Sequence, residues 1–254
     1  MRLHFVLLLL LGACSSSHQG ATTNWSPEVL QVNQLERTAQ FDSLVGRGVI
    51  GFTWTDEKGT HKEQGDLDFW KQGNAISLRI TKLGELIAWF GGEGKAFWFF
   101  DFMGDEPTLT LGGEHGMFND IEIALILLGL SPLPDGEMTT SDGKLTLLDE
   151  QQRRWVVTFD AAGNRPLSIE LTDGEHHATA VHGDEIGVEI DQLHELHWPM
   201  TGGKIELKDN QGNTDIKIIF SSLSTIVEDE PMQRVMDLEY LQGALKPVRI
   251  LEGN

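Results

Sequence analysis

The chain is poor in cysteine and in positive charge, and both shortages exclude classes of protein. Its 254 residues include a single cysteine, so no disulfide can form within the chain. Lysine and arginine number 19 against 39 aspartate and glutamate residues, which gives a formal net charge of -20. A field of this sign repels phosphate backbones, so we do not expect nucleic acid as a partner. The same acidity keeps an exported protein soluble and need not describe a ligand.

Short catalytic motifs are also missing from the sequence. It contains no G-x-S-x-G, no P-loop and no C-x-x-C. Paired carboxylates such as Asp66 and Asp68 resemble those of glycosidases, but a chain this acidic contains such pairs by chance. No nucleophile with a base and an orienting group can be assembled. The sequence therefore predicts no catalytic residues, and we expect that the protein is not an enzyme.

Several histidines in the second half lie among carboxylates and raise the question of a metal site. They are His176, His177, His182, His194 and His197. Zinc proteases need two histidines four residues apart on a helix, whereas His194 and His197 are three apart and Trp198 stands where the second should be. In a strand, odd spacing sends two rings to opposite faces. We expect solvent-facing histidines, with no metal and no cofactor.

A long apolar run is present only at the N-terminus, just before the single cysteine. Residues 5–11 are apolar, too few to span a bilayer, and are typical of a signal peptide. Leu11 and two small residues precede Cys14, which resembles the lipobox of bacterial lipoproteins. The resemblance implies that residues 1–13 are removed and that Cys14 carries covalent lipid such as palmitate, which holds the protein on a membrane surface. Ser15 after the cysteine implies sorting to the outer membrane, facing the periplasm.

The rest of the chain reads as a tether followed by one domain. Residues 14–26 are rich in serine and threonine and predict a lipid-anchored flexible tether, and residues 27–254 predict the domain. Ser26, Pro27 and Glu28 predict a helix start, and we expect a helix over residues 27–43. Its apolar face is expected to comprise Leu30 or Val32, Leu35, Ala39 and Leu44.

The stretch that organises the domain is residues 65–102, an expected antiparallel meander with short turns. Residues 76–81 alternate apolar and polar side chains, which predicts one buried face. Residues 86–90 and 96–100 are apolar at both parities, so both of their faces must be covered.

More strands are expected on both sides of a second, very apolar helix. This helix, over residues 117–130, should lie within or across the mouth of a curved sheet. The tail, residues 231–254, is expected to close a sheet edge. Further strands are predicted at residues 48–55, 63–71, 108–111, 144–148, 155–159, 167–172, 177–181, 188–190, 204–208 and 215–220, and residues 135–143 are read as turns.

This order of elements resembles the LolA/LolB-like lipoprotein-localisation family, and is most similar to its outer-membrane receptors of LolB type. The matching residues are Arg47-Gly48 at a strand start, the aromatic run at residues 68–72, Leu83-Gly84 between two strands, and the apolar helix end at residues 126–130 before Pro132. The resemblance implies a mainly β fold with helices, an incomplete (half-open) antiparallel β-barrel with a helical lid. It also implies that acyl chains are bound and that a LolA-like periplasmic carrier is a partner.

An acyl-chain cavity in such a barrel would bury methylene groups against apolar side chains. Which strand parity faces the cavity is not readable from the sequence, and each aromatic fits ordinary core packing equally well. Leu83 and Gly84 are expected to form a membrane-inserting loop, or else Leu83 folds back onto the sheet. The candidate cavity residues are Trp54, Phe69, Leu78, Ile80, Trp89, Trp98, Phe100, Leu125 and Leu128.

Two other functions remain open from the sequence. The same fold could serve as a structural or interaction lipoprotein whose interior is filled by its own side chains. Metal binding or hydrolysis through the histidine and acid clusters is the third. An apolar void of hundreds of Å³ favours lipid binding, whereas a close-packed interior favours the structural role.

Overall fold

The computed structural model describes residues 25–56, 59–112, 120–190, 200–209 and 214–252. The signal peptide (residues 1–13), Cys14 and most of the tether lie outside the described residues, as do His194 and His197.

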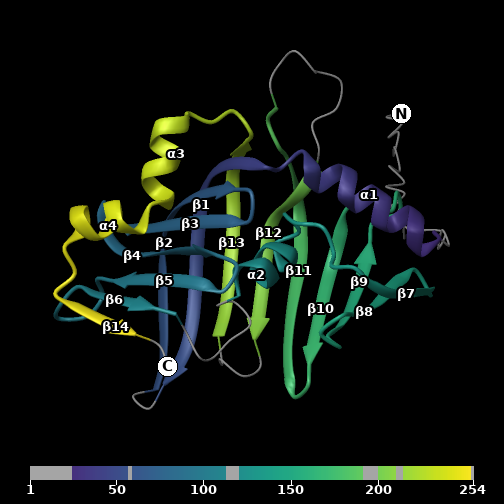
Figure 1. Cartoon of the computed structure of the whole chain (residues 1–254), viewed down its shortest axis with the longest axis horizontal. Coiled ribbons are helices and arrows are strands. Elements are labelled where there is room, and N and C mark those ends of the chain that lie inside the picture. The colour runs from purple at the N-terminus through teal and green to yellow at the C-terminus, as the bar shows by residue number, and fades with distance from the viewer. Residues whose placement is uncertain (1–24, 57–58, 113–119, 191–199, 210–213, 253–254) are drawn as a thin grey trace, which may run out of the picture.

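All strands within the described residues belong to one 14-stranded sheet (Figure 1). It runs from β14 at one edge to β7 at the other, in the order β14-β6-β5-β4-β3-β2-β1-β13-β12-β11-β10-β9-β8-β7. Neighbours pair antiparallel except β14 and β6, which pair in parallel. The strands are β1 (Ser43–Asp56), β2 (Gly59–Gln72), β3 (Ala75–Lys82), β4 (Glu85–Glu93), β5 (Ala96–Asp101), β6 (Thr108–Leu111), β7 (Gly136–Ser141), β8 (Lys144–Asp149), β9 (Arg154–Phe159), β10 (Pro166–Asp173), β11 (His176–Gly187), β12 (Met200–Asp209), β13 (Thr214–Ser224) and β14 (Arg249–Glu252).

The sheet curls without closing. In Figure 1, β9 to β13 lie upright on the page with alternating directions, whereas β4 to β6 lie across it, and α2 is seen between the two groups. Because β7 and β14 are edges that do not pair with each other, the barrel is incomplete. The expected half-open antiparallel barrel with helices is therefore confirmed. The helices are α1 (Pro27–Ala39), α2 (Ile121–Leu127), α3 (Asp229–Met236) and α4 (Leu238–Leu245).

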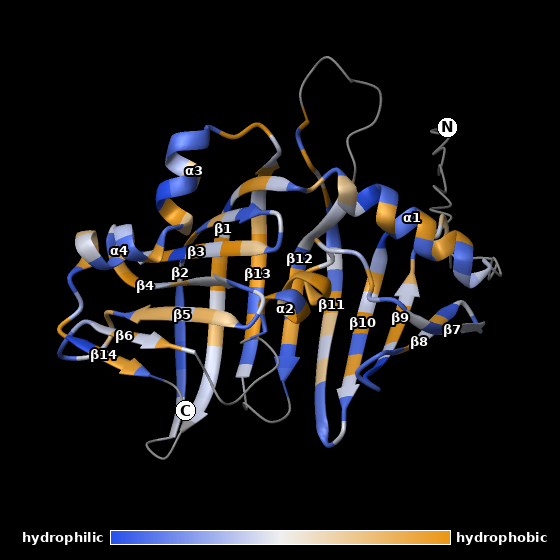
Figure 2. Ribbon diagram, viewed as in Figure 1, coloured by the Kyte–Doolittle hydropathy of each residue, from blue (hydrophilic) through white to orange (hydrophobic). Residues whose placement is uncertain are grey.

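Two separate apolar clusters lie on the two faces of the sheet. The larger one joins α1 and α2 to one face of strands from β1 to β13, and we call this the concave face. The smaller one joins Trp89, Trp98 and Phe100 to Leu241 of α4 on the opposite, convex face. In Figure 2, α2 is mostly orange, and β5 is pale orange over most of its length, so both are largely apolar. The prediction that the meander is covered on both faces is thus confirmed.

Helix α1 starts as predicted but buries a different face. Ser26 caps it by accepting a hydrogen bond from the backbone N–H of Val29, and the helix ends at Ala39 instead of residue 43. Leu30 is buried, whereas Val32 and Leu35 are 50% and 56% exposed. The expected apolar face is therefore largely wrong. The other buried side chains of the helix are polar, namely Gln34, Arg37 and Thr38.

Helix α2 lies where the second helix was expected, but it is shorter. The carboxylate of Asp120 accepts hydrogen bonds from the N–H groups of Glu122 and Ile123 and so fixes the start. The helix ends near Gly129, whose φ of 69° is the left-handed conformation that glycine adopts freely. The expected residues 117–119 lie outside the described residues.

Two other strand predictions changed, and one was confirmed. Strand β7 forms where turns were expected, because its residues pair with β8 along their whole length. Residues 188–190 form only an isolated bridge, between Glu189 and Ser224. The C-terminal tail supplies α3, α4 and β14, and β14 closes the edge next to β6 as expected. Among the described residues, no helix is long and apolar enough to cross a membrane.

Replacing Phe69 by alanine tests the concave core. Phe69 is fully buried and meets Phe220 edge-on, with 5.6 Å between ring centroids. We expect Phe69→Ala to lower the free energy of unfolding by about 3–5 kcal/mol, measured by urea denaturation. The control Val181→Ala, at a residue that is half exposed, should change it by less than about 0.5 kcal/mol. Equal effects of the two would contradict this assignment of the core.

Candidate functional site

The concave face beneath α2 brings together most of the predicted cavity residues. Phe69, Leu78 and Ile80 of the sheet share one cluster with Leu125 and Leu128 of the lid region, and all five are almost fully buried. Trp54 extends this face toward the β1–β2 turn. Its ring stacks on Phe52 at 5.5 Å and on His61 at 4.9 Å between centroids.

Three predicted cavity residues lie elsewhere. Trp89, Trp98 and Phe100 belong to the convex cluster under α4. The indole N–H of Trp89 donates to the hydroxyl of Ser77 at 2.8 Å, and the guanidinium of Arg79 lies 5.7 Å from the Trp89 ring centroid. These three side chains therefore do not contribute to the face beneath α2.

A β-bulge in β4 explains this exchange of faces. Counted from the two-residue β3–β4 turn, an unbroken register would pair Leu78 with Trp89 and place both on one face. Ile87 is an extra residue in β4, and the register shift makes Phe90 the partner of Leu78 instead. Since side chains alternate along a strand, one inserted residue sends every later one to the other face.

The shift identifies aromatic side chains that the sequence analysis missed. Phe90 pairs with Phe99 across β4 and β5, with 6.4 Å between the ring centroids. Phe97, Phe99 and Phe90 pack against the concave core and keep part of their surface exposed. Alternate positions of β5 are apolar on both faces, so periodicity could not show that Phe97 and Phe99 point to the concave face. The bulge in β4 determines this orientation.

Polar contacts at both ends hold α2 on the concave face. At its start, the N–H of Ile121 donates to the carbonyl of Gly94 at 2.8 Å. At its end, Arg37 Nη2 donates to the carbonyl of Gly129 at 2.7 Å, and His182 Nε2 donates to the carbonyl of Leu127 at 2.9 Å. The helix is therefore tied at its two ends, while its middle is held by apolar contact.

The contacts at the C-terminal end of α2 come from buried polar side chains. Arg37 also donates to Gln34 at 2.8 Å, and Gln34 donates to the backbone carbonyl of Asn164. Burial first, and then the like charge of Arg165, lower the pKa of Arg37 to about 10. Burial is also the main reason why the pKa of His182 falls from its ordinary 6.5 to about 4, so the ring is neutral at pH 7.

A groove of about 610 Å³ adjoins α2 and α1. Its lining includes Val32 and Leu35 of α1, Glu122 of α2 and Leu133 beyond the lid, with Arg153 from the β8–β9 turn. The exposed apolar side chains of α1 thus lie along a groove at the margin of the lid.

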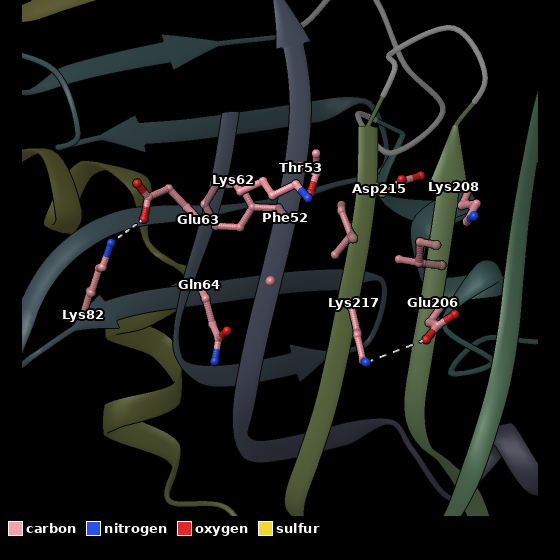
Figure 3. Close-up of a pocket in the computed structure, with 13 residues that line it drawn as sticks. Phe52, Thr53, Lys62, Glu63, Gln64, Lys82, Glu206, Lys208, Asp215 and Lys217 are labelled. Carbon is pink, nitrogen blue, oxygen red and sulfur yellow. Dashed lines mark hydrogen bonds and ion pairs between the residues drawn. The ribbon is translucent and has the colours of Figure 1, made fainter. Parts of the chain in front are cut away.

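Figure 3 shows a second groove, of about 520 Å³, with a polar lining. Gly51 of β1 pairs with Lys217 of β13 on one side and with Gln64 of β2 on the other. Because side chains alternate along a strand, Lys217 and Gln64 lie on the face of the sheet opposite to that of Phe52. The ion pair between Lys217 and Glu206 spans 3.8 Å. Most polar side chains of the groove lie on the convex face, although Phe52, Leu207 and Ile216 of its lining pack in the concave core.

Leu83 occupies an unusual turn. Lys82 pairs with Glu85, so Leu83 and Gly84 alone connect β3 and β4, and both have positive φ, 54° and 84°. The Leu83 side chain is 98% exposed and does not fold back onto the sheet. A leucine in the left-handed region is strained, because asparagine or glycine suits this two-residue turn better.

The expectation that the histidines face solvent is wrong for His182, which is 4% exposed. His176 is exposed, His177 Nδ1 lies 3.2 Å from the hydroxyl of Thr172, and His182 is buried against α2. No group of three histidine, cysteine or acidic side chains within the described ranges could hold a metal ion.

Comparison with known structures bears on this architecture. A crystal structure of a LolA superfamily protein from Nitrosomonas europaea matches 83% of this chain and 99% of its own, with a TM-score of 0.50 and 12% sequence identity. The chain shares the fold of this protein. A domain of an outer membrane lipoprotein-sorting protein from Vibrio parahaemolyticus covers 81% of this chain and 96% of its own, with a TM-score of 0.47 and 12% identity. No protein-family model and no curated protein sequence matches the chain.

The buried ring of His182 predicts a specific pH dependence. Because folding lowers its pKa, the stability it supports is present above pH 6.5 and is lost as pH falls toward 4. Between pH 7 and pH 5, we expect the wild type to lose about 2 kcal/mol more unfolding free energy than His182→Gln. His176→Gln, at an exposed position of the same strand, should behave like the wild type. Parallel losses in wild type and His182→Gln by urea denaturation would contradict the assignment.

Proposed function

We propose that this protein is a lipid-anchored envelope protein that binds acyl chains on its concave face beneath α2, as an outer-membrane acceptor of lipoproteins of LolB type. Cys14 would carry the anchoring lipid, and a LolA-like periplasmic carrier would deliver the cargo. The fold shared with a LolA superfamily protein supports this proposal. No cofactor is required.

The observation that carries the proposal is a short apolar lid on an apolar sheet. Helix α2 has seven residues, and all of them except Glu122 are buried. A helix this short is not stable alone in water, so apolar contact with the sheet must hold it. An acyl chain offers the same kind of contact, at about 0.8 kcal/mol per buried methylene. Chains can therefore take the place of α2 when the contacts at its two ends open.

The margin of the lid offers a route for the chains. The groove beside α1 runs along Glu122 and Leu133, next to the exposed Val32 and Leu35. A carrier that docks on this apolar row would present its cargo directly at the lid. Half-buried Phe90, Phe97 and Phe99 would then receive the chains on the sheet.

One observation favours the alternative of a structural lipoprotein with a filled core. Ile121, Leu125 and Leu127 are at most 1% exposed, so the lid already fills the space beneath it. In that case, the concave face would take up no chain, and the measurement below distinguishes the two functions.

A half-buried aromatic on each face gives a matched test of acyl binding. The chain from Ser15 onward keeps every described residue and is titrated with a fluorescent fatty acid. We expect Phe99→Gln, on the concave face, to weaken binding about tenfold because it removes apolar contact area. Trp70→Gln, on the convex face, should bind like the wild type. Absence of binding by the folded wild type would support the filled core.

We also propose that Leu83 inserts into the membrane surface at the tip of the β3–β4 turn. The fully exposed leucine and its strained backbone support this role, since neither is explained by packing.

Leu83→Asn separates stability from membrane contact. Asparagine relieves the positive φ, so we expect the unfolding free energy to rise by about 0.5–1 kcal/mol. Co-sedimentation of the chain from Ser15 onward with phospholipid vesicles should fall at the same time. Leu83→Met, which keeps an apolar tip, should retain it. Unchanged sedimentation of Leu83→Asn would rule out insertion.

A further inference from the structure

Two arginines and a histidine meet beneath α1, at a place that apolar binding does not use. Arg37 of α1, Arg165 of the β9–β10 turn and His182 of β11 are 7%, 6% and 4% exposed. Gln34, which accepts a hydrogen bond from Arg37, donates to the carbonyl of Asn164 beside Arg165. Gly129, whose carbonyl Arg37 binds, lies against the His182 ring and Pro166, because a Cβ on it would be 3.1 and 3.3 Å from them. Two positive charges are therefore buried near each other in a chain with a net charge of -20.

Most of the nitrogen atoms of this cluster have no partner. Arg37 and Arg165 each use Nη2, which donates from Arg37 to Gly129 and Gln34, and from Arg165 to Glu185 at 2.8 Å. Nε and Nη1 of both arginines are buried donors without a hydrogen-bond partner in the part of the chain that the structure describes. Nδ1 of His182 is also buried without a partner, but it is an acceptor, because Nε2 carries the proton. Buried donors and charges left in this way are strongly unfavourable.

The neighbouring carboxylates do not supply the missing acceptors. Glu185 is more than half exposed and contacts Arg165 only through Nη2. Asp160 accepts backbone N–H groups of Asn164 and Arg165, at 2.9 and 3.3 Å, through one oxygen. Its charge raises the pKa of Arg37, but less than burial and Arg165 lower it. The cluster thus retains an excess of positive charge.

We propose that Arg37 and Arg165 bind a small oxyanion, a carboxylate or a phosphate group, beside the C-terminal end of α2. Guanidinium groups make their strongest hydrogen bonds to these two anions. Gly202 lies against the His182 ring, and a side chain at this position would not fit, because its Cβ would be 2.9 Å from Nδ1 of His182. One bound oxyanion would offset the repulsion between the two guanidinium groups and accept hydrogen bonds from their unpaired N–H groups.

The position of the site relates it to the lid. The same Arg37 and His182 side chains hold the carbonyls of Gly129 and Leu127 at the end of α2. The oxyanion can therefore come from the headgroup of a lipid whose chains lie beneath α2, or from solution. The second source does not depend on acyl binding, so the two proposals can fail separately.

Arginine-detected NMR gives a direct test. The ¹⁵N-labelled chain from Ser15 onward is titrated with inorganic phosphate at constant ionic strength, and the Nε–Hε signals are followed. We expect the signals of Arg37 and Arg165 to shift and saturate. The signal of Arg153, whose Nε is already paired with Asp149 at 2.7 Å, should not move. In the variant Arg165→Gln, the Nε–Hε signal of Arg37 should need at least about tenfold more phosphate to reach half of its shift. The loss of Arg165 leaves no buried charge unpaired at Glu185, because that side chain is 54% exposed.

A second titration separates the two sources. Hexadecanoate that moves both arginine signals, while its methyl ester does not, identifies a lipid headgroup; a response to phosphate alone identifies a free oxyanion. Either result supports the site. If no probe moves the two signals, water satisfies the nitrogens and the proposal is overturned. Two acidic residues close in sequence, Asp191 and Glu195, lie outside the described residues. The proposal is also overturned if Asp191→Asn with Glu195→Gln shifts both arginine signals in the absence of any probe, because the acceptor then belongs to the chain itself.

Discussion

The structure depends on one constraint: strands β4 and β5 carry apolar side chains on both faces, so both faces must be kept from water. On the concave face, this cover is α2, a helix too short to stand alone. On the convex face, α4 covers Trp89, Trp98 and Phe100, and β14 then pairs with β6 at the edge. The two covers differ in kind. The convex one belongs to a continuous C-terminal segment of helices and strand, whereas α2 is held by apolar contact and polar contacts at its ends.

Helix α1 links this lid to the second half of the sheet. An amphipathic helix ordinarily buries its apolar side, but α1 buries Gln34 and Arg37 and exposes Val32 and Leu35. The buried polar side chains contact backbone carbonyls that a helix end and a turn leave free. Helix α1 therefore buries the charge of Arg37 in place of the apolar side chains Val32 and Leu35. Those two exposed side chains line the groove beside α2.

Much of the fold could be predicted from the sequence, because alternation, turns and the N-cap at Ser26 are local signals. The sequence did not show which aromatic side chains of β4 and β5 point to the concave face. The extra residue Ile87 in β4 places Phe90 there instead of Trp89, and no local pattern of the sequence marks this bulge. The burial of Arg37 and His182 could not be predicted either. Their hydrogen-bond partners are the backbone carbonyls of Gly129 and Leu127, which are far away in the sequence. The place of Leu83 in the β3–β4 turn could be predicted, since a leucine before glycine between two strands is a local feature, and its insertion into a membrane stays a prediction.

The central claim is that the concave face holds acyl chains, and the most direct measurement is mass spectrometry of lipid extracted from the protein. The chain from Ser15 onward, exported to a bacterial periplasm and purified without detergent, should carry fatty acid, phospholipid or lipopeptide in an amount comparable to the protein. A folded wild-type protein that carries no acyl lipid would contradict the account and leave a structural lipoprotein whose concave face is permanently filled by α2.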